Sequence, residues 1–294
     1  MLPTDWRRRF RGRWSRDRPL APCTTWRIGG PAQLYFEPAG VLDLARTVRM
    51  LRRIGAPWRI LGGGSNLLVS DGGVAGAVVS LARLRTIRRA GERVEADAGA
   101  RLADVVRFCA GRGLGGLEPL AGIPGSVGGA VFGNAGSRHG AIGHRVRALD
   151  LLTPQGEVER RVPGEGFFGY RSSGVGDAVV LRVELDVAPA AVGDVCLRTR
   201  EIVRERNRSQ PGWVGNAGCV FRNPAEGSAG RLIDRAGCKG MRAGGVRVSR
   251  RHANFFQNEG DGTAEQVERL IDRVRDRVRR ACGIELELEV RRWG

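Results

Sequence analysis

Two uncharged, glycine-rich runs in this chain could hold an anion with main-chain groups alone. The longer run, Gly122–Gly136, reads GIPGSVGGAVFGNAG and contains six glycines, and the shorter run, Gly62–Asn66, reads GGGSN. Glycine adopts backbone angles that other residues avoid, and successive N–H groups in such turns form a concave anion site. The runs therefore indicate a phosphate-bearing ligand, and the alternative is a tight connection between two packed elements.

Neither run matches a known phosphate-binding signature. Leu67 stands where G-x-G-x-x-G needs its third glycine, and neither run contains the Gly-Lys-Ser/Thr of a Walker motif. Two separate runs would still suit a long ligand such as a dinucleotide, because its pyrophosphate needs several N–H donors.

Four residues later in the chain could carry chemistry, but each also has a structural interpretation. Arg171 could be a surface cation and Cys219 a small buried hydrophobic residue. Glu289 could belong to the solvated face of a strand, and His252 could be a satisfied core histidine. Local context alone favours the structural interpretation of each.

The composition restricts the class of protein. The chain has 294 residues, of which 41% are hydrophobic, and it lacks the ~18 consecutive apolar residues that a membrane helix needs. Its formal charge of +18 comes almost entirely from arginine, because Lys239 is the only lysine. We interpret this bias as codon usage and not as a surface for nucleic acid.

Cysteine and histidine are used sparsely. The six cysteines are scattered without a C-x-x-C pair, which argues against a zinc site and a compact disulfide framework. With only three histidines we expect no metal site, and we expect reduced thiols in a cytoplasmic protein.

The first 22 residues are strongly basic. Seven arginines stand against Asp5 and Asp17 before residue 20, and the apolar core of a secretory signal is missing. We expect residues 1–22 to be a disordered basic leader that arises from an upstream start. A basic arm that binds RNA is the alternative.

The hydrophobic pattern predicts the elements that must position the two runs. Strands are expected near Ala32–Glu37, Trp58–Leu61 and Gly76–Leu81, with a helix over Val41–Leu51. A second set of elements is expected at Arg93–Ala96 (strand), Leu102–Cys109 (helix), Arg147–Thr153 (strand) and Ala178–Val187 (strand).

A distinct C-terminal region is expected after Pro189–Gly193. It begins with a helix over Val195–Arg208 and ends with a helix that starts at a capping box of Thr263 and Gln266 and stops at Gly283. Apolar and charged residues then alternate from Ile284 to Arg291, which predicts a final strand.

Taken together and in order, the motifs resemble a known family. From about Thr25 onward the chain contains TWRIGGPA, LGGGSNLLVSD, LAGIPGSVGGAVFGNAG, YRSS, AGCVFRNP, AGRLIDRAGCKG, VSRRHANFFQN and LEVR. This set resembles the UDP-N-acetylenolpyruvoylglucosamine reductases, flavoenzymes of peptidoglycan precursor synthesis. Only about twenty-five residues separate YRSS from the helix at Val195, as in the shorter, type II branch of that family.

The resemblance implies an α+β fold. It comprises a two-subdomain FAD-binding region of the PCMH/VAO type at residues 23–190 (subdomains 23–85 and 86–190) and an α+β substrate-binding domain at 191–294. It also implies NADPH as co-substrate, UDP-N-acetylglucosamine enolpyruvate as substrate, and a monomer that binds neither nucleic acid nor membrane. The residues expected at FAD are Gly62, Gly63, Gly64, Ser65, Asn66, Ile123, Pro124, Gly125, Ser126, Gly128, Gly129, Asn134 and Arg291.

The resemblance implies a reaction in two halves. NADPH passes a hydride to N5 of FAD, and the flavin then passes a hydride to the enolpyruvyl double bond. Arg171 would bind the substrate carboxylate, and Glu289 would lie across it. The residues expected to bind the UDP-sugar are Tyr170, Arg222, Asn223, Lys239, His252 and Asn254.

One residue departs from the family pattern. The family's proton donor is a serine in a G-S-x-F-x-N-P run, and this chain has Cys219 at that position. A thiol with a pKa of ~8.5 is a stronger acid than a hydroxyl, so we expect Cys219 to be the general acid. The alternatives to the whole assignment are another FAD-linked oxidoreductase of the same architecture and a basic nucleic-acid-binding protein.

Overall fold

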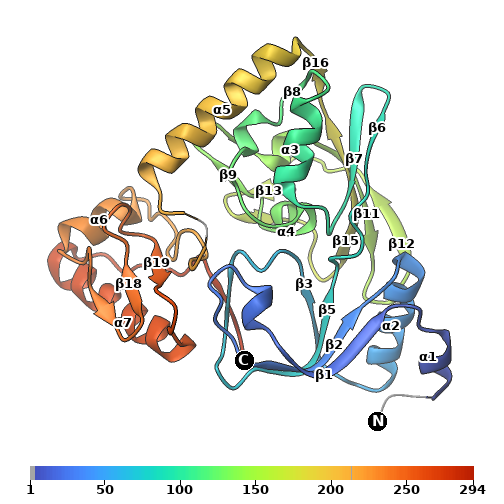
Figure 1. Cartoon of the computed structure of the whole chain (residues 1–294), viewed down its shortest axis with the longest axis horizontal. Helices are drawn as coiled ribbons and strands as arrows, with labels where there is room; N and C mark the ends of the chain where they lie inside the picture. The colour runs from blue at the N-terminus through green and yellow to red at the C-terminus, as the bar shows by residue number, and fades with distance from the viewer. Residues whose placement is uncertain (1–3, 213) are drawn as a thin grey trace. The chain divides into compact units, whose positions relative to one another are not determined.

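The structure, a computed structural model, describes residues 4–212 and 214–294. The chain divides into two compact units, each built from segments that are not contiguous in sequence (Figure 1). Unit 1 comprises the described part of Met1–Arg16, together with Leu34–Gly63 and Gly76–Glu205. Unit 2 comprises Asp17–Gln33, Gly64–Ala75 and Arg206–Gly294.

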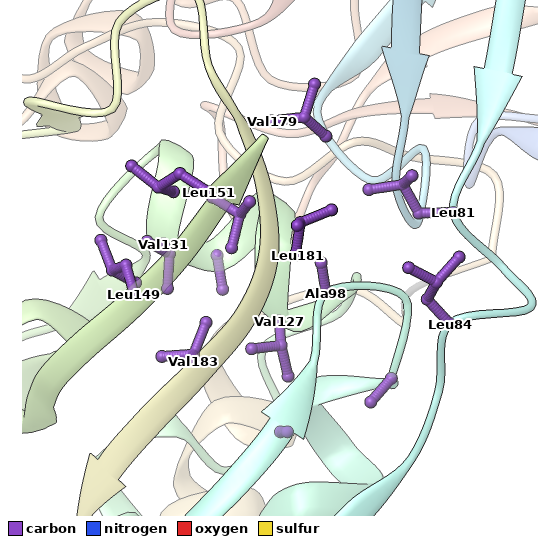
Figure 2. Packing of buried hydrophobic residues seen from close by; sticks show 14 of the residues in the cluster. Leu81, Leu84, Ala98, Val127, Val131, Leu149, Leu151, Val179, Leu181 and Val183 are labelled. Carbon is purple, nitrogen blue, oxygen red and sulfur yellow. The ribbon is translucent and has the colours of Figure 1, made fainter. Parts of the chain in front are cut away.

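Unit 1 contains a five-stranded antiparallel sheet in the order β12-β11-β15-β7-β6. Helix α4 packs against β15 and β7, and Figure 2 shows leucine and valine side chains from α4, β11 and β15 meeting in the core. The bounds are β6 Ile87–Ala90, β7 Arg93–Asp97, α3 Leu102–Ala110, α4 Val127–Phe132, β11 Val146–Leu152, β12 Val158–Arg161 and β15 Val179–Asp186.

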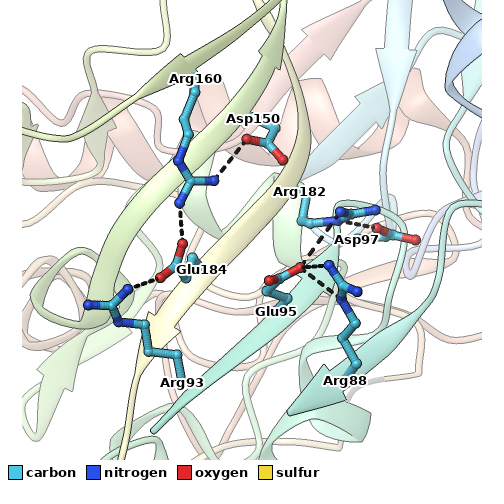
Figure 3. A network of polar contacts seen from close by, with 8 residues as sticks. All are labelled: Arg88, Arg93, Glu95, Asp97, Asp150, Arg160, Arg182 and Glu184. Carbon is cyan, nitrogen blue, oxygen red and sulfur yellow. Dashed lines mark hydrogen bonds and ion pairs between the residues drawn. The ribbon is translucent and has the colours of Figure 1, made fainter. Parts of the chain in front are cut away.

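Charged side chains of the same sheet form ion pairs from strand to strand (Figure 3). Glu184 on β15 pairs with Arg160 on β12 and with Arg93 on β7, the latter at 2.5 Å. Burial raises the pKa of Glu184, but the hydrogen bonds and charges of these two arginines outweigh it, so that the pKa lies below its usual value. Part of the arginine excess is therefore used inside unit 1.

A second sheet has four strands in the order β1-β2-β5-β3, and most of its residues belong to unit 1. Strands β3 and β5 are parallel, and α2 buries Leu44, Val48 and Leu51 in the core of unit 1. The bounds are β1 Arg13–Pro19, β2 Pro31–Glu37, α2 Val41–Arg53, β3 Trp58–Leu61 and β5 Val74–Ser80.

The expected disorder of residues 1–22 is wrong for the described residues 4–22. They form α1 (Thr4–Arg9), then β1, then the start of a 3-10 turn, η1 (Ala21–Cys23). Trp6 is buried, stacks on Phe10 at 4.6 Å and meets the edge of Phe36 at 5.2 Å. These aromatic contacts anchor a segment whose arginine content indicated disorder; residues 1–3 lie outside the described residues.

The two compact units do not coincide with the expected domains at 23–190 and 191–294. Unit 1 continues through most of α5 (Val192–Ser209), to Glu205; Arg198 of that helix pairs with Glu118 at 2.9 Å. Residues 17–33 and 64–75 pack instead with the C-terminal segment. Buried Trp26, for example, donates from Nε1 to the carbonyl of Phe256 at 2.8 Å.

Unit 2 packs α6 and α7 with a three-stranded antiparallel sheet in the order β17-β18-β19. The capping box of Thr263 and Gln266 is confirmed, and Gly283 ends α7 in the left-handed conformation. The bounds are α6 Ala229–Arg235, β17 Arg242–Ala243, β18 Val246–Val248, β19 Phe256–Asn258 and α7 Ala264–Cys282.

The expected final strand over Ile284–Arg291 is only partly formed. The regular strand β20 covers Arg291–Trp293 and runs parallel to β4 (Leu67–Val69). Before it, Leu286 and Val290 are buried as the alternation predicts, but the segment pairs with its neighbour only through an isolated bridge at Leu288.

The remaining elements are short and lie in unit 1. They comprise paired strands and 3-10 turns, and their bounds are β8 Leu114–Gly115, η2 Glu118–Leu120, β9 Gly136–Ser137, β10 Gly140–Ala141, η3 Ile142–Arg145, β13 Phe168–Gly169, β14 Ser172–Ser173 and β16 Ala188–Pro189.

Candidate functional site

The two glycine runs lie against one another in unit 1. A Cβ added to Gly63 would lie 2.5 Å from the Cα of Gly125, and one added to Gly62 would lie 2.5 Å from the Oγ of Ser126. Real Cβ atoms do not come this close to backbone, so the contact requires glycine at Gly63, whereas at Gly62 the Ser126 hydroxyl could rotate away. The structure therefore joins two runs that are about sixty residues apart in sequence.

The tip of the longer run offers main-chain donors. Ser126 caps α4, and its Oγ accepts a hydrogen bond from the N–H of Gly129 at 3.4 Å. Within the described residues, no group accepts a hydrogen bond from the N–H of Gly125 or of Ser126. Gly125 has a φ of +108°, a backbone angle that favours glycine. Two adjacent N–H groups are thus available to an anion.

Other residues of the longer run have structural roles. The N–H of Gly128 donates to the carbonyl of Ala98 at 2.8 Å, and a Cβ on Gly128 would lie 2.8 Å from that of Ala98. Ile123 is buried in the core of unit 1.

The C-terminal end of the longer run holds the hairpin that carries Arg171. Asn134 is buried, accepts from the N–H of Gly143 at 3.0 Å and donates from Nδ2 to the carbonyl of Gly169 at 2.8 Å. Arg171 lies in the turn between β13 and β14 with a φ of +54° and donates to the carbonyl of Gly136 at 3.3 Å. The glycine run therefore positions Arg171.

The guanidinium of Arg171 also lies near the Tyr170 ring. Its Cζ is 5.4 Å from the centroid of that ring, at a distance suited to a cation–π interaction. The Tyr170 side chain is about half exposed.

In unit 2, the end of the shorter run meets the C-terminal segment. The Nδ2 of Asn66 donates to the carbonyl of Glu289 at 3.1 Å, and the N–H of Arg291 donates to the carbonyl of Asn66 at 3.0 Å. Gly64 has a φ of +61°, and a Cβ there would lie 2.0 Å from the carbonyl oxygen of Cys23. Three predicted site residues, Asn66, Glu289 and Arg291, thus share one hydrogen-bonded segment.

Cys219 begins a segment that lies between two others in unit 2. Cys219 forms an antiparallel bridge with Phe255, and Phe221 forms one with Leu288. The carbonyl of Val220 accepts from the N–H of Glu289 at 2.8 Å. The segment of Cys219 is therefore hydrogen-bonded to the segment of Glu289.

Two asparagines expected at the substrate are hydrogen-bonded to the chain itself. The side chain of Asn254, 1% exposed, bonds to both the N–H and the carbonyl of Phe221. The Oδ1 of Asn223 accepts from the N–H of Ala229 at 3.0 Å, at the start of α6. Asn216, which the sequence reasoning did not single out, is fully buried and accepts from the N–H of Gly218 at 3.0 Å. The sequence contained a signal for Asn216, because the tripeptide Asn-Ala-Gly begins both at Asn134, which was predicted, and at Asn216.

His252 is held as a neutral ring in unit 2. Its Nδ1 accepts from the N–H of Asn254 at 3.3 Å, which assigns the proton to Nε2. Burial, and secondarily the charge of Lys239, lowers the pKa of His252. Lys239 itself pairs with Asp234 at 2.7 Å.

Two cavities are lined by none of the predicted site residues. One of about 570 Å³ in unit 1 is lined by Glu118, Arg145 and Arg198 among others, and one of about 320 Å³ in unit 2 by Arg247, Arg250 and Arg251 among others. Neither includes a residue that the sequence predicted.

Some classes of site are absent from the part of the chain that the structure describes. There, no three His, Cys, Asp or Glu side chains are placed to bind a metal, and no helix is both long and apolar enough to span a bilayer. Among the predicted catalytic residues, Arg171 belongs to unit 1, and Cys219 and Glu289 belong to unit 2.

Two family models match this chain, one in its N-terminal part and one at its C-terminal end. Residues 32–161 match the model of the FAD binding domain, and residues 210–293 match that of the C-terminal domain of UDP-N-acetylenolpyruvoylglucosamine reductase. These matches fall on the glycine runs and on the Cys219 segment, respectively.

Similar proteins cover almost the whole chain. The UDP-N-acetylenolpyruvoylglucosamine reductase of Heliobacterium modesticaldum is 44% identical over 97% of this chain and 92% of its own length. The crystal structure of that reductase from Thermus caldophilus matches with a TM-score of 0.84 and 36% identity, over 97% of this chain and all of the other. BBE-like 1 of Physcomitrella patens, 14% identical with a TM-score of 0.50 over 63% of this chain and 44% of its own, shares the fold alone.

Proposed function

Because the chain belongs to the UDP-N-acetylenolpyruvoylglucosamine reductases, we propose that it reduces the enolpyruvyl group of UDP-N-acetylglucosamine enolpyruvate to give UDP-N-acetylmuramate, with NADPH as electron donor. The cofactor is FAD. The observation that carries the proposal is the hydrogen bond between Glu289 and Val220, because it joins the segments of two predicted catalytic residues.

The residues at the glycine runs fit FAD. The available N–H groups of Gly125 and Ser126 suit a pyrophosphate, and the glycine contact at Gly63 removes side chains that would hinder a close approach. We assign Gly62, Gly63, Gly125 and Ser126 to this role in unit 1. When bound, FAD supplies the hydride transfer from the nicotinamide to the substrate.

Arg171 would bind the substrate carboxylate. Its planar fork of N–H donors can form two parallel hydrogen bonds to a carboxylate. The positive φ of Arg171 and its bond to Gly136 hold the residue at the turn of its hairpin. As the double bond is reduced, negative charge develops toward the carboxylate, and a fixed guanidinium stabilises it.

Cys219 would deliver the proton. The hydride forms a C–H bond at one alkene carbon and the S–H proton forms the second C–H bond at the other, which leaves a thiolate that solvent reprotonates. A thiol with a pKa of ~8.5 is protonated at neutral pH and releases its proton more readily than a hydroxyl. The hydrogen bonds around Val220 and Phe221 fix the segment that carries this thiol.

Glu289 would act at the same carboxylate, where a protonated carboxyl group can donate a further hydrogen bond. Arg291 would contact the cofactor, and Tyr170, Arg222, Lys239 and His252 the UDP-sugar. We further propose that the protein is a cytoplasmic monomer. Light scattering after gel filtration tests the oligomeric state.

The decisive experiment combines a spectrum with turnover. The purified protein is expected to be yellow, and to oxidise NADPH only when the enolpyruvyl sugar nucleotide is present. NADPH oxidation at the same rate with oxygen alone would indicate another FAD-linked oxidoreductase. Colourless protein with salt-sensitive binding to nucleic acid would overturn the proposal entirely.

A further inference from the structure

Cys219 lies between two asparagines whose side chains are buried and hydrogen-bonded to the main chain. Asn216 precedes it by three residues and is fully buried, and Asn254 is 1% exposed. Buried amides seldom persist without partners, because an unsatisfied polar group in the interior is costly. Both amides bond to main chain within two residues of Cys219: Asn216 to Gly218, and Asn254 to Phe221.

Asn254 holds the chain immediately after Cys219. Its Oδ1 accepts from the N–H of Phe221 at 2.9 Å, and its Nδ2 donates to the carbonyl of Phe221 at 2.8 Å. Its own carbonyl accepts from the N–H of Val220 at 2.8 Å. The side chain thereby takes the place of a strand neighbour for Phe221, while the main-chain carbonyl of Asn254 holds Val220.

Asn216 holds the chain immediately before Cys219. Its Oδ1 accepts from the N–H of Gly218 at 3.0 Å, and its Nδ2 donates to the carbonyl of Gly212. Gly218 has a φ of +78°, so the turn into Cys219 is made in the left-handed region. The amide closes this turn with a side-chain bond.

We propose that Asn254 and Asn216 are positioning residues that set the direction of the Cys219 thiol for proton delivery. This inference rests on the role of Cys219 in the proposed function. It gives Asn254 a role different from the substrate contact that the sequence predicted, because both ends of its amide are bonded to Phe221.

The test compares Asn254→Ser and Asn216→Ser with a matched control, Asn258→Ser. Asn258 lies in the same unit and also bonds to main chain, through Gly260, Gly262 and Trp26. The two positioning variants should slow reoxidation of FAD by the substrate at least tenfold while leaving its reduction by NADPH within twofold. The control should change neither by more than twofold after correction for folded fraction.

A second readout needs no turnover. Alkylation of Cys219 by iodoacetamide, followed by peptide mass spectrometry across pH, should change in rate at least threefold in the positioning variants and not in the control. Unchanged alkylation and reoxidation in folded Asn254→Ser would overturn the proposal; if that variant does not fold, Asn216→Ser decides in the same way.

A double variant separates this inference from the role of Cys219. If Asn254 acts through the thiol, Cys219→Ala with Asn254→Ser should reoxidise no more slowly than Cys219→Ala alone. An additive loss would overturn the positioning role. Full-rate reoxidation in Cys219→Ala would instead refute the proton donor, and the alkylation readout would still test the positioning.

Discussion

The side-chain amide of Asn66 donates a hydrogen bond of 3.1 Å to the main-chain carbonyl of Glu289, a residue 223 positions later in the chain. The return bond, from the N–H of Arg291 to the carbonyl of Asn66, closes a two-bond link. The end of the shorter glycine run is thereby connected to the segment that carries a predicted catalytic carboxyl group.

Removing this link should lower stability and turnover together. Asn66→Ala leaves the Glu289 carbonyl without its donor, and we expect a loss of about 1–2 kcal/mol in the free energy of unfolding. Urea unfolding and kcat measure the two effects. Asn66→Asp should behave like the alanine variant, because a carboxylate cannot donate; a wild-type kcat in both would show that the link does not support catalysis.

Gly63→Ala should impair FAD retention. Its Cβ would lie 2.5 Å from the Cα of Gly125, so the two runs must separate, at an expected cost of about 1–3 kcal/mol. The ratio of visible to ultraviolet absorbance measures retention. In the control, Gly72→Ala, the nearest atom would be the Oγ of Ser70 at 3.7 Å; equal retention in both variants would contradict the importance of the contact.

Thiol reactivity should differ between cysteines. Burial raises the pKa of Cys109 to about 12 and also raises that of Cys238, so both should resist iodoacetamide at pH 8 in the folded protein. Peptide mass spectrometry before and after unfolding measures this difference. Rapid labelling of Cys109 in the native state would contradict its burial.

His252 should make stability depend on pH. Because its native pKa is lowered, the unfolded chain binds a proton first as the pH falls below about 6.5. The free energy of unfolding is therefore unaffected by His252 above that pH and decreases as the pH falls toward the native pKa. The slope of this decrease is at most about 1.4 kcal/mol per pH unit. Urea unfolding between pH 5 and 8 should show a flatter profile in His252→Gln, and parallel profiles would exclude this source.

Glu118 should contribute stability that acid removes. Burial raises its pKa, but hydrogen bonds from the main chain and from Arg198 outweigh this and lower it. The contribution is present above about pH 4.5 and is lost as the pH falls through the native pKa. Glu118→Gln should cost about 1.5–3 kcal/mol at pH 7 and less at pH 4; an equal cost at both would contradict the charge effect.

Local patterns predicted the elements that depend on neighbouring residues. The 3.6-residue apolar spacing and the capping box located α7, and glycine identified the two runs, because these signals act within a few residues. The alternation at Ile284–Val290 predicted the burial of Leu286 and Val290 but not the missing strand pairing. Pairing depends on the neighbour that the segment meets, which lies far away in sequence.

The sequence by itself determined the family and the residue types available for chemistry, because the motifs and their order can be read directly from the amino-acid sequence. Only the tertiary structure decided how Trp6 anchors a basic segment, how residues 17–33 and 64–75 join unit 2, and that the Asn254 side chain bonds to Phe221. Each of these outcomes depends on packing or hydrogen bonds between residues that are distant along the chain. Local propensity contains no record of such contacts.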